Sequence, residues 1–177
     1  MILSSSFFTG YAQNKISIRK KALAVCLFTI LSVFLPYVFH QFGAAGRIFL
    51  PMQIFILVAA LTFGYQTGMI VGLMTPLISY FVSGMPVWAV LPVITLESLI
   101  YGLLAGILRE KFRLSVVVAL LVTAISGRIF LIPLIDGLTG FNGWIYVKEA
   151  VIFGWPGIIL QLVSVPVLAR FAGKIFN

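Results

Sequence analysis

The stretch from Gly46 to Gly106 decides the fold: GRIFLPMQIFILVAALTFGYQTGMIVGLMTPLISYFVSGMPVWAVLPVITLESLIYGLLAG. It contains three apolar segments of about membrane length, separated only by GYQTG at 64–68 and SGMP at 83–86. Polar residues gather at these corners, and one carboxyl, Glu97, lies inside an apolar segment. Turns this short leave no room for a soluble domain between the segments.

The composition is that of an integral membrane protein. Of the 177 residues, 62% are hydrophobic and 9% are charged, and the mean hydropathy is +1.17, which is outside the range of soluble domains. A chain that crosses a bilayer must satisfy every backbone N–H and C=O internally, and only helices and closed barrels do so. The apolar runs lack the alternation of a barrel wall. The sequence therefore predicts an all-α integral membrane protein.

Segment lengths predict six transmembrane helices in one compact bundle. A hydrocarbon core of about 30 Å requires about 20 helical residues. This length places helices at 22–39, 48–63, 69–82, 87–108, 114–135 and 145–171 of a single domain that spans residues 1–177. The third helix is short for a full span, and Pro76 predicts that it is tilted, bent or broken. Residues 40–46 and 136–144 are predicted outer loops, and residues 109–113 form a predicted inner loop.

The net charge of +8 is interpreted as a topology signal. Nine of the twelve Lys and Arg residues, at positions 15, 19, 20, 21, 109, 111, 113, 170 and 174, fall on the predicted side that holds both chain ends. An excess of Lys and Arg marks the cytoplasmic side of a membrane. Both termini, including the segment 1–21, are therefore predicted to be cytoplasmic, and nucleic acid is not an expected partner.

Charged residues inside the apolar segments are candidates for function. Glu97, Arg128 and Glu149 are predicted to lie in the outer half of the bundle, where each costs at least a few kcal/mol unless it is paired or hydrated. Tyr101 follows Glu97 by four residues and shares its helix face. Two interpretations remain open: an ion pair between Glu97 and Arg128 that holds helices together, or a hydrated ligand site that contains one or both.

Other candidate ligand-binding residues are polar or aromatic groups near the predicted outer surface. They are Arg47, Asn142, Trp144 and Trp155. Aromatic residues at this level are typical of the interfacial belt of membrane proteins. The alternative is that they cover a flat ligand, as aromatic side chains do in apolar pockets with a few polar groups. Trp155 belongs to GWPG at 154–157, which is expected to open the helix backbone near a pocket floor.

Small residues recur at helical spacing and predict close contacts between helices. The series are Gly68 and Gly72; Thr75, Ser79 and Ser83; and Ser98, Gly102 and Gly106. Spacings of four stack these residues on one helix face, where backbones can approach closely. The face is interpreted as packing within the bundle, with docking of a partner helix as the alternative.

The residues needed for catalysis or metal binding are scarce. The sequence has one Cys and one His, Cys26 and His40, at opposite ends of the first predicted helix, and four carboxylic residues. It has no phosphate-binding glycine loop and no nucleophile paired with a base. We therefore expect no enzymatic activity, no catalytic residues, no metal site and no cofactor.

Several motifs resemble the substrate-binding S components of energy-coupling factor (ECF) transporters, which are bacterial vitamin importers of the ABC class. The motifs are FLPMQ at 49–53, residues 64–72 with Pro76, SGMP at 83–86, and Leu91-Pro92 with Glu97, Tyr101, Gly102 and Gly106. The resemblance covers the middle third of the chain by motif and the whole chain by length and six-helix layout.

The resemblance implies a multi-pass protein of the bacterial plasma membrane that captures a small water-soluble vitamin or related micronutrient at the outer face. It implies three partners, a transmembrane coupling subunit and two cytoplasmic ATPase subunits, which drive delivery inward. The family's two docking alanines correspond to Ala22 and Cys26. Gln53, a further substrate-binding candidate, occupies a position where close relatives are expected to have histidine.

Two other functions remain open at this stage. One is a stand-alone secondary carrier in which Glu97 relays protons, since ionisable residues inside membranes often serve such relays. The other is a small membrane enzyme that uses Glu97 and Glu149.

Overall fold

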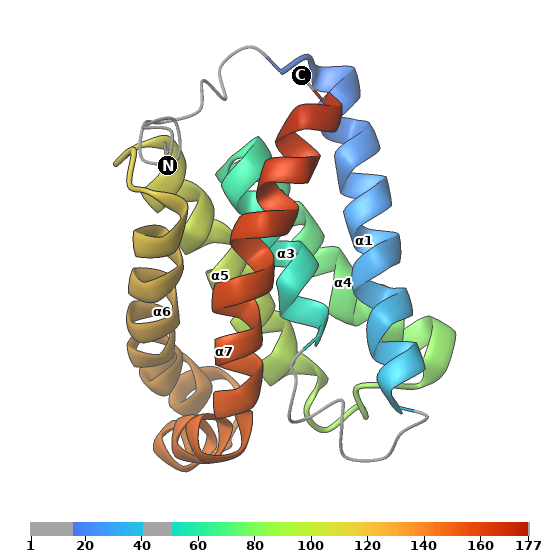
Figure 1. Cartoon of the computed structure of the whole chain (residues 1–177). Coiled ribbons are helices and arrows are strands. Elements are labelled where there is room, and N and C mark those ends of the chain that lie inside the picture. The colour runs from blue at the N-terminus through green and yellow to red at the C-terminus, as the bar shows by residue number, and fades with distance from the viewer. Residues whose placement is uncertain (1–15, 41–50, 177) are drawn as a thin grey trace.

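The structure, a computed structural model, describes residues 16–40 and 51–176 (Figure 1). Six α-helices make up this part of the chain: α1 (Ile18–His40), α3 (Pro51–Phe63), α4 (Tyr65–Ser83), α5 (Leu91–Glu110), α6 (Val116–Leu138) and α7 (Gly143–Phe176). Four of them, α1, α5, α6 and α7, are long and apolar enough to cross a membrane. The prediction of an all-helical membrane protein is confirmed.

The short helix α3 forms the centre of the bundle. It has 13 residues and packs against α1, α4, α5 and α7, while α6 packs against α5 and α7. Ile56, Val58 and Phe63 on α3 are fully buried. A helix that is apolar on all sides belongs in the interior of a bundle, which explains why α3 is enclosed.

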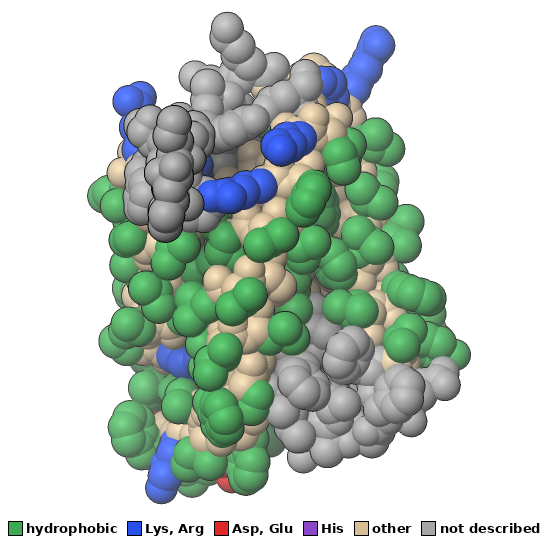
Figure 2. Space-filling view, in the orientation of Figure 1, with side chains coloured by type: hydrophobic (Ala, Val, Ile, Leu, Met, Phe, Trp, Pro, Cys, Tyr) green, Lys and Arg blue, Asp and Glu red, His purple; other side chains and the backbone are tan. Residues whose placement is uncertain are grey.

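Large apolar side chains cover the outside of the bundle. Ile30 of α1, Phe130 of α6 and Ile159 of α7 are all more than half exposed. Figure 2 shows apolar side chains over much of the height of the visible surface. Exposed apolar surface of this extent is expected where a protein contacts lipid tails rather than water.

Helices α4 and α5 pack closely through their small residues. A Cβ atom built on Gly68 would lie 2.5 Å from the backbone oxygen of Gly102, and one built on Gly72 would collide with the backbone oxygen of Ser98. A Cβ on Gly106 would likewise collide with the backbone of Tyr65. The interpretation of these residues as a packing face within the bundle is confirmed.

The predicted helix ends need correction in several places. The predicted turn at 64–68 contains only one residue outside a helix, Gly64, whose φ of 95° suits glycine; Tyr65 already begins α4. Helix α4 runs without a break for 19 residues with Pro76 inside it, so it is longer than the predicted 69–82 and, of the three predicted forms, is not the broken one. Arg109 and Glu110 belong to α5 rather than to a loop. The start of the predicted second helix, 48–50, lies outside the described residues.

The predicted outer loop at 136–144 is also too long. Asp136 lies within α6 and Trp144 within α7. Asp136 Oδ1 accepts a hydrogen bond of 2.7 Å from the backbone N–H of Gly143, and Asn142 Oδ1 accepts one of 2.9 Å from that of Ile145. Side-chain oxygens that satisfy the free N–H groups at a helix start extend the helix, and these two let α7 begin earlier than hydropathy predicted.

The helix ends that carry most of the positive charge meet at one end of the bundle. Lys20 Nζ at the start of α1 donates a hydrogen bond of 2.6 Å to the backbone oxygen of Phe176 at the end of α7. The ring of Phe176 also packs edge-on against Phe63 at the end of α3, with 5.0 Å between ring centroids. Figure 2 shows several Lys and Arg side chains at this end. We call it the basic end.

Glu110 links two helices at the basic end. Its Oε2 atom accepts a hydrogen bond of 3.1 Å from the backbone N–H of Tyr65, the first residue of α4. A carboxylate at a helix N-terminus satisfies a free N–H and complements the helix dipole. Glu110 therefore caps α4 from the neighbouring helix.

We expect Glu110→Ala to lower the free energy of unfolding by about 1 kcal/mol because α4 loses this cap. Reversible unfolding in detergent, followed by circular dichroism, measures the change. Glu110→Gln, which keeps an oxygen acceptor but removes the charge, is expected to lose only part of this stability. Equal stability of Glu110→Ala and the wild type would contradict the capping role.

Candidate functional site

The candidate site is a group of polar side chains inside the bundle, which extends from its middle toward the end remote from the basic end. Glu97 on α5 is 5% exposed, and its Oε2 accepts a hydrogen bond of 2.8 Å from the hydroxyl of Tyr146 on α7. Glu97 lies six residues after the first residue of α5, or about 9 Å along the helix. This bond joins α5 to α7 in the buried interior.

Arg128 on α6 is buried without partners for two of its nitrogens. The residue is 8% exposed, and neither its Nε nor its Nη1 atom has a hydrogen-bond partner. It lies ten residues before the end of α6, about 15 Å along the helix, and thus near the middle of this 23-residue helix. A buried guanidinium without partners is costly, so Arg128 is the polar group here that most needs a ligand.

Glu97 and Arg128, both within the described residues, form no ion pair. The carboxylate of Glu97 is instead bonded to Tyr146. The interpretation of these two residues as a purely structural ion pair is therefore wrong. Arg128 retains the capacity to bind an acceptor that the protein does not itself supply.

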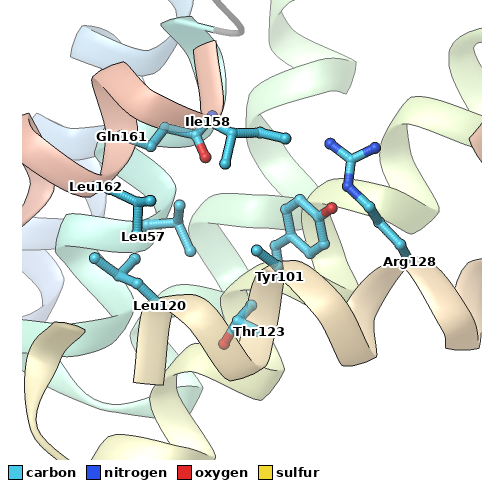
Figure 3. Close-up of a pocket in the computed structure, with 9 residues that line it drawn as sticks. Leu57, Tyr101, Leu120, Thr123, Arg128, Ile158, Gln161 and Leu162 are labelled. Carbon is cyan, nitrogen blue, oxygen red and sulfur yellow. The ribbon is translucent and has the colours of Figure 1, made fainter. Parts of the chain in front are cut away.

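A small cavity lies beside Arg128, between α3, α5, α6 and α7 (Figure 3). Its volume is about 20 Å³, and its lining residues are Leu57, Tyr101, Leu120, Thr123, Ala124, Arg128, Ile158, Gln161 and Leu162. This volume holds about one water molecule, whereas pockets for drug-sized ligands have about 300 to 1,000 Å³. The bundle is therefore closed around the cavity, and a vitamin-sized ligand requires these helices to separate.

Tyr101 occupies the wall of this cavity because α6 has a glycine opposite it. A Cβ atom on Gly127 would collide with the ring of Tyr101. Tyr101 is 3% exposed, and its hydroxyl has no hydrogen-bond partner. Figure 3 shows this hydroxyl pointing toward the guanidinium of Arg128. Gly127 thus lets Tyr101 and Arg128 present two unsatisfied polar groups to the same region.

Gln53 and Gln161 form the polar floor of the same region. Gln161 lines the cavity, and its Nε2 atom donates a hydrogen bond of 3.3 Å to Gln53 Oε1. Both side chains are buried, at 6% exposed for Gln53 and 8% for Gln161. This bond fixes α3 to α7 and places Gln53 next to the cavity, although Gln53 does not line it.

The structure leaves four predicted ligand-binding residues outside this buried group. Glu149, Asn142, Trp144 and Trp155 are exposed, with Trp144 at 63% and Trp155 at 59%. Asn142 caps α7, and the tryptophans lie on the outer surface, as expected of residues in an interfacial belt. Arg47 lies outside the described residues. Glu149 is exposed, whereas Glu97 is buried.

The predicted docking residues lie on the outside of α1. Ala22 and Cys26 are both exposed, and Leu23 and Leu27 beside them are also exposed. This surface is accessible to lipid or to a partner helix. Among the residues that the structure describes, no group of three His, Cys, Asp or Glu side chains could hold a metal ion.

Sequence reasoning missed two contributors to the site. Thr123 lines the cavity and its hydroxyl has no partner, and Tyr146 binds Glu97. Thr123 is one polar residue in a long apolar segment, which is a weak signal. Tyr146 falls at the start of the predicted last helix, 145–171, but nothing in the local sequence indicates that its hydroxyl reaches Glu97, which is 49 residues away.

Comparison with protein families identifies one that covers most of the chain. The model of 5TM-5TMR_LYT, described as the 5TMR of 5TMR-LYT, matches residues 5–139. This segment contains α1, α3, α4, α5 and α6 and ends one residue after α6, so that α7 lies beyond it. Comparison with curated proteins and with solved structures gave no match. The chain belongs to the membrane family described as the 5TMR of 5TMR-LYT.

Proposed function

We propose that the protein is a substrate-binding membrane subunit without enzymatic activity, which captures a small water-soluble molecule such as a vitamin and passes it inward. The observation that carries this proposal is the buried guanidinium of Arg128, two of whose nitrogens lack hydrogen-bond partners, beside a cavity in the bundle. Polar groups buried within a membrane are costly and are typically functional. A ligand that satisfies Arg128 offsets this cost.

The proposed topology has six transmembrane helices and places the basic end in the cytoplasm of a bacterial cell. The helix ends at the basic end carry Arg19, Lys20, Lys21, Arg109, Lys111, Arg113, Arg170 and Lys174. A concentration of Lys and Arg at one end favours a cytoplasmic location for that end. Both chain ends then face the cytoplasm, and the cavity beside Arg128 lies near the middle of the bundle, which a molecule from outside would approach from the opposite end.

The proposed partners are a transmembrane coupling subunit and two cytoplasmic ATPase subunits. The support for them is the resemblance of residues 49–106 to S components, together with the absence of an ATP-binding motif from the chain. The matched family is a different family from the S components, so the partners depend on that resemblance alone. In this proposal the exposed surface around Ala22 and Cys26 contacts the coupling subunit.

A thermal-shift screen of the purified protein against water-soluble vitamins tests ligand capture. A ligand at about 100 times its dissociation constant is expected to add about 2.7 kcal/mol to the free energy of unfolding. Arg128→Ala and Glu97→Ala are each expected to weaken binding by at least about tenfold, or about 1.4 kcal/mol. Trp155→Ala, at an exposed position, is the control and should bind normally. Unchanged affinity in both site variants would refute this site.

A proton-coupled carrier that acts alone is the second candidate function. The hydrogen bond between Glu97 and Tyr146 favours it, because a buried carboxyl with a hydroxyl neighbour can belong to a proton relay. Uptake by liposomes that contain only this chain, driven by a proton gradient, would support the carrier. Co-purification with a coupling subunit and an ATPase pair, with no uptake by the chain alone, would support the importer subunit.

A further inference from the structure

The polar groups that lack partners around the cavity are hydrogen-bond donors. Arg128 contributes two buried nitrogens, and Tyr101 and Thr123 each contribute a buried hydroxyl. The amide nitrogen of Gln161 is already bonded to Gln53. A guanidinium can only donate hydrogen bonds, and a hydroxyl can donate one. A hydroxyl can also accept, but the two Arg128 nitrogens cannot, so the requirement that Arg128 sets at this site is for an acceptor.

The charge around the cavity is also unbalanced. Its described lining residues include one cation, Arg128, and no Asp or Glu. The nearby carboxylate of Glu97 does not line the cavity. It accepts a hydrogen bond from the hydroxyl of Tyr146. A water molecule could accept a hydrogen bond from Arg128 but would add no negative charge to the cavity lining. An anion would supply both the acceptor and the opposite charge, and such charge-assisted bonds are about twice as strong as neutral ones.

We propose that Arg128 and Tyr101 form an anion site, with Thr123 on its wall, that binds one negatively charged group. The inference rests on the proposed function and adds the charge of the ligand to it. The cavity of about 20 Å³ fits a group not much larger than water. The group is a small inorganic anion such as chloride, or the carboxylate of an organic ligand that enters when the surrounding helices separate.

Replacing Glu97 is expected to change the affinity for an anion in a direction that a neutral or cationic ligand would not show. Because its carboxylate is buried in the same half of the bundle, it repels an anion bound at Arg128. Glu97→Gln removes this repulsion and leaves an oxygen that can still accept from Tyr146. We expect Glu97→Gln to tighten the binding of an anion by about threefold or more, while Glu97→Ala, which also removes the acceptor for Tyr146, weakens it.

Matched acids and amides test the proposal on the purified full chain in detergent. The probes are nicotinate with nicotinamide, biotin with biotinamide, and sodium chloride with sodium gluconate, each titrated in a thermal-shift assay. We expect at least one of nicotinate, biotin and chloride to raise the melting temperature of the protein. The paired probe, the amide of the acid or gluconate in place of chloride, is expected to leave the melting temperature unchanged. Arg128→Gln should reduce the affinity for that probe by at least about tenfold, and Arg128→Lys should restore part of it.

Lys148→Gln is the matched control, because Lys148 is an exposed cation on α7 in the same half of the molecule. It should bind the acid or chloride as the wild type does. Stabilisation by chloride alone would identify an inorganic anion as the occupant, and stabilisation by an acid in chloride-free buffer would identify a carboxylate ligand.

Other outcomes separate this proposal from the proposed function. An amide that binds as tightly as its acid, with Arg128→Gln unaffected, would overturn the anion site and leave vitamin capture intact. Chloride binding that depends on Arg128, without any vitamin binding or uptake, would support the anion site and overturn the transport proposal. No response of the wild type to any of the six probes would overturn the anion site.

Discussion

Replacing Arg128 by methionine is expected to raise the free energy of unfolding of the ligand-free protein by about 2 to 3 kcal/mol and to abolish ligand binding. Arg128 is 92% buried, since its exposed fraction is 8%, and two of its nitrogens lack partners. Methionine has similar length, no charge and no donors, and buried ionic groups can often be replaced by apolar ones with a gain in stability. A gain in stability with a loss of binding would mean that Arg128 serves ligand binding rather than folding.

Arg109 provides the matched control for this prediction. It is buried to a similar degree, at 6% exposed, and one of its nitrogens, Nε, also lacks a partner, but its Nη1 atom donates a hydrogen bond of 2.7 Å to the backbone oxygen of Leu114 after the end of α5. Arg109→Met leaves that oxygen without this donor and is expected to destabilise the protein by about 1 to 3 kcal/mol.

Equilibrium unfolding of both variants in the same detergent gives the comparison. Destabilisation by Arg128→Met equal to that by Arg109→Met would show that Arg128 is a structural residue. In that case, a loss of binding in Arg128→Met could be explained by the loss of stability. The ligand-capture and anion-site proposals would then lose the observation on which both depend, the unsatisfied nitrogens of Arg128.

Replacing Gly102 by alanine is expected to lower the free energy of unfolding by about 3 kcal/mol, because overpacking a close contact costs about 1 to 3 kcal/mol or more. A Cβ atom at Gly102 would collide with the backbone oxygen of Gly68 on α4 and would lie 3.3 Å from Ile56 Cγ2 on α3. Backbone atoms cannot move aside as a flexible side chain can. The helices α4 and α5 must therefore separate or shift along their length.

Gly137→Ala tests whether this effect comes from the close contact or from glycine itself. Gly137 lies in α6, and a Cβ atom there would meet nothing within 4 Å. Alanine has a higher helix propensity than glycine by about 1 kcal/mol, so Gly137→Ala is expected to be neutral or stabilising. Unfolding of the two variants in detergent measures the difference, and equal destabilisation would contradict the packing account.

The amino-acid sequence alone determined the class of fold and much of its pattern. Apolar segments of membrane length can be recognised in the sequence, because a helix that contacts lipid must have few charged side chains. The spacing of four between Gly68 and Gly72, and between Ser98, Gly102 and Gly106, identified the packing face because helical geometry fixes which residues share a side. Glu97, Tyr101 and Arg128 stood out because charged and polar groups are rare in such segments.

Only the tertiary structure decided how these residues combine. The hydrogen bond from Tyr146 to Glu97 joins residues 49 positions apart, and that from Gln161 to Gln53 joins residues 108 apart, so no local pattern could reveal them. Helix starts depend on caps such as Glu110 and Asp136, which belong to other helices. That two nitrogens of Arg128 lack partners is likewise a property of the whole bundle, because every helix around the cavity determines which acceptors reach them.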